Sequence, residues 1–122
     1  MTVFDSNAIL RYILQDNEEM ADTVEARIGE DDCCIPTEVI AEMVYVLSKV
    51  YHIPRQEISS AILGVLDIVN IQIPNREVVI KGLDCYSTTS LDFVDCLMVG
   101  YQYNGCEVFT FDEKLQKRLD RE

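Results

Sequence analysis

Acidic side chains stand at four places in this sequence where a carboxylate could do chemistry. Asp5 and Asp112 each follow a short run typical of a β-strand, whereas Glu42 and Asp95 lie in segments of helical periodicity. In open α/β sheets ligands bind at the carboxyl ends of the strands. Four carboxylates gathered there suit hard divalent cations such as Mg²⁺ or Mn²⁺, and one or two such ions can activate a water for attack on a phosphodiester. The residue types therefore favour a metal-dependent hydrolytic site.

The two helical acids each have an acidic neighbour on the same helix face. Glu38 precedes Glu42 by four residues, and Asp92 precedes Asp95 by three. Asp92 is thus a further candidate metal ligand, ranked below Asp95. Aliphatic residues surround Glu42 and Asp95 in the helical pattern, and a carboxylate among them is costly unless a cation or hydrogen bonds compensate its charge. This pattern favours a functional role for both.

Structural roles remain open for the other acids. Asp5 and Asp112 each precede a predicted helix, so either one could simply be its N-cap. Glu38 and Asp92 could equally be acids near a helix N-terminus, where they complement the helix dipole.

The elements that must position these acids alternate along the chain. Runs typical of strands lie at residues 2–4, 33–35, 70–73 and 107–111. Helical patterns cover residues 8–14, 18–28 (stopped by Gly29), 38–51, 54–69, 75–86 and 90–104 (capped by Ser90 and stopped by Gly105), and a last helix starts at Asp112. The alternation predicts an α/β fold of three layers, α/β/α, around a parallel sheet of four to five strands. The helix at 38–51 is apolar around most of its circumference and should be largely buried.

Length and composition bound the remaining possibilities. With 122 residues, 48% of them hydrophobic, the chain fits one domain spanning residues 1–122. No apolar run reaches the roughly 18 residues of a membrane helix, and the N-terminus does not resemble a secretory signal. The odd number of cysteines, without C-x-x-C spacing, argues against zinc and predicts reduced, mostly buried thiols in a cytoplasmic protein. They are Cys33, Cys34, Cys85, Cys96 and Cys106.

The net charge of −12 should repel a nucleic acid. The acids must therefore serve divalent metals, or face solvent and a basic partner. One local feature opposes this repulsion of nucleic acid. Four basic residues form a stripe at i, i+3, i+4 and i+7 on the last helix: Lys114, Lys117, Arg118 and Arg121. If functional, this stripe would hold RNA phosphates, with Arg11 as a further candidate. The alternative is complementation of the helix dipole by an exposed helix end.

Four segments together resemble the PIN-domain family, in particular the VapC-like toxin ribonucleases of toxin–antitoxin pairs. Their order and spacing agree along the whole chain, and the four in register are more specific than any one alone. The matching stretches are Asp5–Arg11, Val39–Leu47, Leu91–Leu97 with its D-x-x-D pair, and Thr110–Leu115.

The resemblance implies a metal site made of Asp5, Glu42, Asp95 and Asp112, which Asn7 and Thr110 orient through hydrogen bonds. It implies an endoribonuclease that uses one or two Mg²⁺ or Mn²⁺ ions to hydrolyse RNA, with no DNA-specific binding. It also implies a homodimer that a small antitoxin protein inhibits. The alternative is a catalytically silent PIN-like scaffold for a partner protein, which the acidic composition favours. A strand-end aspartate phosphatase is disfavoured because the second acid of its D-x-D pair is Asn7 here.

Overall fold

Three very short strands form a parallel sheet in the computed structural model, which describes residues 1–122. They are β1 (Thr2–Val3), β2 (Cys33–Cys34) and β3 (Ile71–Gln72), in the spatial order β1-β2-β3. Cys33 pairs with Thr2 on one side and with Ile71 on the other. The expected parallel sheet is confirmed, but the expectation of four to five strands is wrong.

The segment expected as a further strand, residues 107–111, is neither strand nor helix. None of its backbone groups bonds to another backbone group, and the side chains of Phe109 and Phe111 are 84% and 90% exposed. Their rings contact each other edge to face, with centroids 5.3 Å apart. The β-branched and aromatic residues of this segment predict a strand, and that expectation is wrong. A strand also needs a neighbouring strand, and this segment has none.

Seven helices connect and extend the strands. Each expected helix is present, with ends shifted by a few residues. They are α1 (Ser6–Leu14), α2 (Glu18–Glu30), α3 (Thr37–Lys49), α4 (Arg55–Leu66), α5 (Arg76–Thr88), α6 (Phe93–Tyr103) and α7 (Glu113–Arg121).

Three helix boundaries test residues that the sequence marked as caps or stops. Gly29 does not stop α2, which continues through Glu30. Gly105 does follow the end of α6, and its φ of +101° is the left-handed conformation that favours glycine. Ser90 is not the cap of α6, because that role falls to Asp92, which therefore lies just outside the helix.

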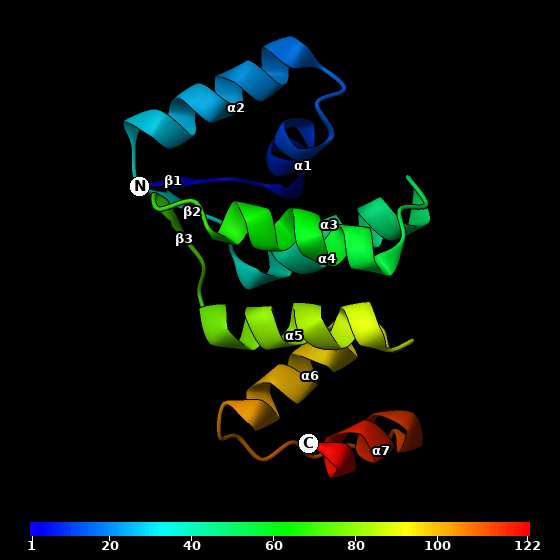
Figure 1. Ribbon diagram of the computed structural model, residues 1–122. Coiled ribbons are helices and arrows are strands. Elements are labelled where there is room, and N and C mark those ends of the chain that lie inside the picture. The colour runs from blue at the N-terminus through cyan, green and yellow to red at the C-terminus, as the bar shows by residue number, and fades with distance from the viewer.

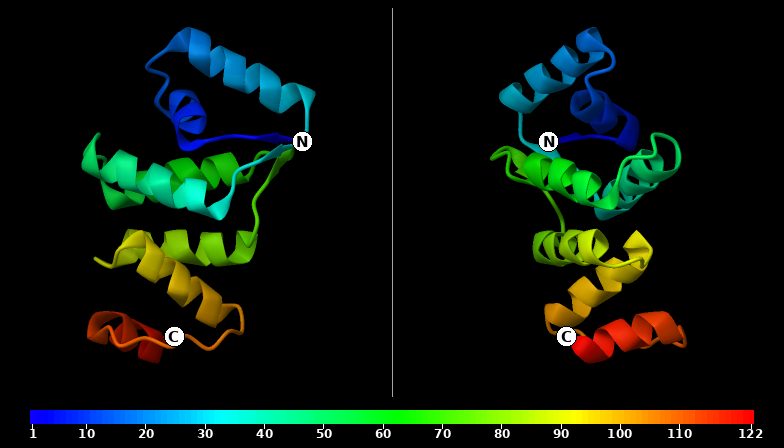
Figure 2. Two further views of the ribbon diagram at one scale, coloured as in Figure 1. Left: turned by 180° about the vertical axis from the view of Figure 1, so that it is seen from behind. Right: turned by 45° about the vertical axis from the view of Figure 1, so that its right-hand side comes forward.

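The elements follow one another from one end of the molecule to the other (Figure 1). α1 and α2 lie beside β1 at one end, α3 and α4 occupy the middle, and α5, α6 and α7 continue to the opposite end. Two further views, turned about the same vertical axis, show the same succession (Figure 2). The N-terminal strand and the C-terminal helix are thus separated by the helices between them.

One cluster of 29 buried residues runs through β2, β3 and all seven helices, and includes Phe4 just after β1. Each buried Ile or Leu in it contributes about 1.5–3 kcal/mol relative to an exposed one. Helices α5 and α6 approach closely at Gly100, where a Cβ would come within 2.4 Å of the Val78 carbonyl oxygen. Cys33, Cys85 and Cys96 are buried, and all five thiols are free. No helix has the length and apolar character needed to cross a membrane.

Helix α3 is less buried than its sequence indicates. One face carries core residues, among them Ile40 and Leu47, but Tyr45 on the other face is 63% exposed and Val50 is exposed as well. The expectation of a largely buried helix is therefore wrong for this face, since no other element packs on it.

Candidate active site

Asp5 joins the end of β1 to the start of α1. Its carboxylate accepts a hydrogen bond from the Ala8 backbone N–H at 2.9 Å, which makes Asp5 the N-cap of that helix. The cap uses one carboxylate oxygen, and the other remains for a ligand. A cleft of about 390 Å³ opens beside Asp5 and is also lined by Asn7, Arg11 and Glu19.

Asp112 is the N-cap of α7, as Asp5 is of α1. Its carboxylate accepts a hydrogen bond from the Leu115 backbone N–H at 2.8 Å. The hydroxyl of Thr110 accepts a further bond from the Asp112 backbone N–H at 3.0 Å, and so fixes the turn that leads into the helix. The structural role left open for both strand-end aspartates is thus present, and it is compatible with a second role for the free carboxylate oxygen.

Asp95 lies half-buried in the first turn of α6. Burial raises the pKa of its carboxyl group, and the nearby carboxylates of Asp112 and Asp92 raise this pKa further. The positive charge of Lys114 acts in the opposite direction and lowers the pKa of Asp95. Three of the candidate acids and one lysine therefore lie close enough to act on one another electrostatically.

Asp92 and Asp95 both line a cleft of about 530 Å³ between α3 and α6. Arg55 lies in the same cleft. It donates hydrogen bonds to the carbonyl oxygens of Tyr86, at 2.8 Å, and of Leu91, and its guanidinium stacks 3.6 Å from the centre of the Tyr86 ring. Arg55 therefore ties the end of α5 to the loop that carries Asp92. No spacing in the sequence marked this residue, because its partners are backbone carbonyls.

Glu42 is exposed on α3, and so is Glu38 one turn earlier. The prediction that Glu42 lies among buried apolar side chains is wrong. Ala41 and Tyr45, its neighbours on the helix, do line the cleft that contains Asp95. Glu42 thus stands beside this cleft, and burial gives no separate argument for its function.

The four acids do not come together within one chain. No three side chains among Asp, Glu, His and Cys are placed so that they could hold a metal ion. Asp5 belongs to the end of the molecule that contains β1, whereas Asp112 begins α7 at the other end, with α3 to α6 between them (Figures 1 and 2). The expected gathering at one sheet edge fails because residues 107–111 do not join the sheet and so do not carry Asp112 there. As placed in a single chain, these acids do not fit a metal centre.

The basic stripe lines a cleft of its own, of about 290 Å³, together with Thr88, Thr89 and Ser90. Its members are Lys114, Lys117, Arg118 and Arg121. Lys114 donates to the Ser90 carbonyl oxygen at 3.4 Å, and Arg118 forms an ion pair with Glu122 at 3.2 Å.

Arg11 lies apart from the basic stripe. It forms an ion pair with Asp16 at 2.6 Å and donates to the Tyr51 hydroxyl at 3.1 Å, in the half of the molecule that contains Asp5. The structure therefore separates the RNA-binding candidates into Arg11 and the group on α7.

A family model described as the PIN domain matches residues 2–122. The chain belongs to the PIN-domain family. Comparisons with curated proteins and with solved structures give no match. The family is one of metal-dependent nucleases, which supports a nuclease role for this PIN domain.

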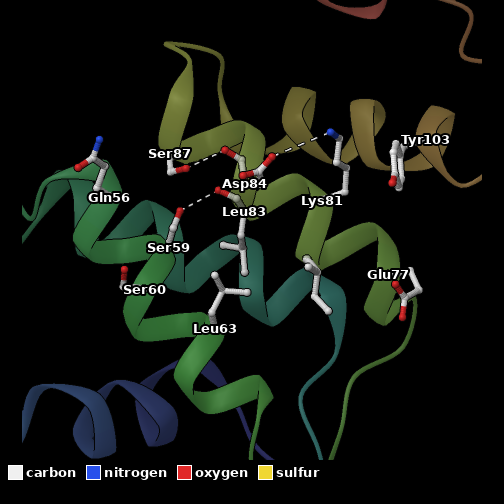
Figure 3. Close-up of a pocket in the computed structure, with 11 residues that line it drawn as sticks. Gln56, Ser59, Ser60, Leu63, Glu77, Lys81, Leu83, Asp84, Ser87 and Tyr103 are labelled. Carbon is white, nitrogen blue, oxygen red and sulfur yellow. Dashed lines mark hydrogen bonds and ion pairs between the residues drawn. The ribbon is translucent and has the colours of Figure 1, made fainter. Parts of the chain in front are cut away.

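The largest cleft of this PIN domain, about 710 Å³ between α4 and α5, contains none of the predicted site residues (Figure 3). Several of its polar groups form hydrogen bonds or ion pairs within the cleft. The Ser59 hydroxyl donates to the Leu83 carbonyl oxygen at 2.9 Å, and Lys81 lies 4.0 Å from Asp84. The candidate chemistry of this chain is therefore elsewhere, at the Asp5 and Asp95 clefts.

Proposed function

We propose that this chain is an endoribonuclease that hydrolyses RNA phosphodiester bonds with one or two Mg²⁺ or Mn²⁺ ions. The observation that carries the proposal is the match of the PIN-domain model to residues 2–122, and half-buried Asp95 with Asp92 and Asp112 nearby adds support. Like charges held together at a half-buried position raise the free energy of the ionised state unless a cation compensates them. A divalent ion would compensate these charges and lower the pKa of a water, whose hydroxide form attacks phosphorus, in an arrangement that brings the acids closer together than they lie in this structure.

The chain's own cations support RNA as the substrate. Lys114 lies close to both the acids and the basic cleft, so a phosphate held by the cleft would stand beside the carboxylates. The four basic residues of the cleft are a large share of the ten in the whole chain. Gathering them on one surface lets a strongly acidic protein attract a polyanion locally.

The experiment that tests this function is cleavage of total RNA by the purified protein. Reactions with Mg²⁺, with Mn²⁺ and with a chelator are compared, single-stranded DNA serves as a second substrate, and the RNA ends are mapped. We expect metal-dependent cuts at a few RNA sites and no cutting of DNA. Intact RNA at every metal concentration would contradict the proposal.

We further propose that the chain is the toxin of a type II toxin–antitoxin pair. The net charge of −12 suits a small antitoxin with a basic segment. Expression of this chain alone should arrest growth, and co-expression of a short neighbouring reading frame should relieve the arrest. Unimpaired growth at high expression would count against a toxin.

The separation of the carboxylates favours a second candidate, a catalytically silent PIN-like scaffold. Titration with Mn²⁺ distinguishes the two functions. Binding below millimolar concentration supports the nuclease, whereas no binding at millimolar Mn²⁺ supports the scaffold.

A further inference from the structure

The cleft between α3 and α6 combines an exposed aromatic ring with two cations. One face of α3 lines it, because Ala41, Tyr45 and Lys49 follow one another at i, i+4 and i+8. The ring of Tyr45 is 63% exposed, and α6 contributes Val94, which is also exposed. Arg55 supplies the second cation. Apolar and aromatic walls with a few charged groups among them are typical of a ligand site.

Neither cation of this cleft is neutralised by an acid of the chain. Lys49 is exposed, and neither Lys49 nor Arg55 forms an ion pair, although Asp92 and Asp95 line the same cleft. The hydrogen bonds of Arg55 go to two carbonyl oxygens and leave its other N–H groups available. The cleft therefore offers two positive charges to an anion, within a chain whose net charge is −12.

Arg55 is also held in place before any ligand binds. Its guanidinium stacks 3.6 Å from the centre of the Tyr86 ring and is fixed by the carbonyl oxygens of Tyr86 and Leu91. An arginine that is already ordered loses little conformational entropy when it binds an anion. This arrangement favours Arg55 as a fixed anion contact and the more exposed Lys49 as a flexible one.

A nucleotide presents the groups that match this cleft. Its base is a flat ring system that stacks on aromatic side chains, and its phosphate carries negative charge. Tyr45 and Lys49 are neighbours on the surface of α3, with about 5–6 Å between the Cβ atoms of such a pair, so that one nucleotide can reach both. The volume of about 530 Å³ is ample for a ligand of this size.

We propose that this cleft holds one unstacked nucleotide of single-stranded RNA, with its base against Tyr45 and its phosphate at Lys49 and Arg55. The choice of RNA rests on the nuclease function proposed above. Tyr45 is then a positioning residue for the substrate. The basic cleft on α7 has no aromatic side chain in its lining, so it offers charge to phosphates but no surface on which a base stacks. A duplex keeps its bases stacked on one another and presents none to Tyr45.

Binding of a short, labelled, single-stranded RNA in the presence of a chelator tests the stacking without any need for cleavage. We expect Tyr45→Ala to weaken binding about fivefold or more, and Tyr45→Phe, which keeps the ring, to bind as the wild type does. Tyr103→Ala is the matched control, because Tyr103 is 70% exposed and lies outside this cleft. Binding of duplex RNA should be the same for Tyr45→Ala and the wild type.

The salt dependence separates the ring from the cations. Lys49→Gln should reduce the slope of log K against log salt by about 0.7, the value of one phosphate contact on a single strand. Tyr45→Ala should lower the affinity for single-stranded RNA at every salt concentration without changing that slope. Equal affinities of Tyr45→Ala and Tyr103→Ala for single-stranded RNA overturn the proposal. A wild type that binds no single-stranded RNA also overturns it.

Cleavage kinetics distinguish this proposal from the nuclease function on which it rests. We expect Tyr45→Ala to raise KM and to leave kcat unchanged, because the ring contributes binding before and during the reaction alike. RNA binding that depends on Tyr45 in a protein that never cleaves refutes the nuclease and leaves the nucleotide site in place. An active nuclease whose KM is unchanged by Tyr45→Ala refutes the nucleotide site alone.

Discussion

A single aspartate can cap a helix and hold a ligand at the same time, and Asp112 offers a way to separate the two roles. We expect Asp112→Ala to lower the free energy of unfolding by about 1 kcal/mol, because the bond from Leu115 N–H is lost, whereas Asp112→Asn should leave it almost unchanged. Both variants should lose RNA cleavage. Urea denaturation measures the first effect and an RNA cleavage assay the second. Full cleavage by Asp112→Asn would leave Asp112 as a cap only.

At the residue scale, the sequence identified candidate acids but did not decide between a structural role and a ligand role for each of them. For Asp5 and Asp112 the same residue satisfies a capping pattern and a ligand pattern, so only the hydrogen bonds decide that the cap exists. The exposure of Glu42 could not be predicted from α3, because an apolar helix face is buried only when another element covers it. The half-burial of Asp95 agrees with its predicted apolar surroundings.

At the scale of elements, the packing of α5 on α6 depends on a glycine. We expect Gly100→Ala to destabilise the fold by about 1–3 kcal/mol, because the new methyl group would come within 2.4 Å of the Val78 carbonyl oxygen. Gly64→Ala is the matched control, since nothing lies within 4 Å of its Cβ and an exposed helical alanine stabilises by up to about 1 kcal/mol. Thermal unfolding measures both. Equal melting temperatures for the two variants would show that the helices can separate at no cost.

The helices and the parallel sheet were predictable here, whereas the number of strands was not, for a physical reason. A helix forms its hydrogen bonds within itself, so local periodicity is enough to place α1 to α7 to within a few residues. A strand depends on a partner that is distant in the sequence. Residues 107–111 have the pattern of a strand and lack the partner, and this one difference displaces Asp112 from the sheet edge.

At the scale of the whole molecule, the net charge and the local basic cleft act in opposite directions. We expect Lys117→Gln to weaken RNA binding and to reduce the slope of log K against log salt by about 0.7–0.9, the value of one lost phosphate contact. Arg27→Gln, an exposed substitution on α2, should leave that slope unchanged. A salt titration of RNA binding in the absence of divalent ions measures both. Identical slopes for the two variants would show that Lys117 in this cleft makes no contact with an RNA phosphate.

The assembly of the acids also belongs to this scale. Family resemblance and sequence spacing both point to Asp5, Glu42, Asp95 and Asp112 as one site, yet a single chain separates them. Spacing along the chain does not specify that residues 107–111 stay out of the sheet, and their position leaves Asp112 away from Asp5.

The measurement that tests the nuclease assignment most directly is RNA cleavage by Asp95→Asn. Burial and two neighbouring carboxylates raise the pKa of Asp95, so its charged form is disfavoured in the folded protein, and a neutral asparagine should not lower the free energy of unfolding. We expect a folded protein that no longer cuts RNA in Mg²⁺ or Mn²⁺, whereas Glu30→Gln, at an exposed acid of α2, cuts as the wild type does. Undiminished cleavage by Asp95→Asn would contradict the account.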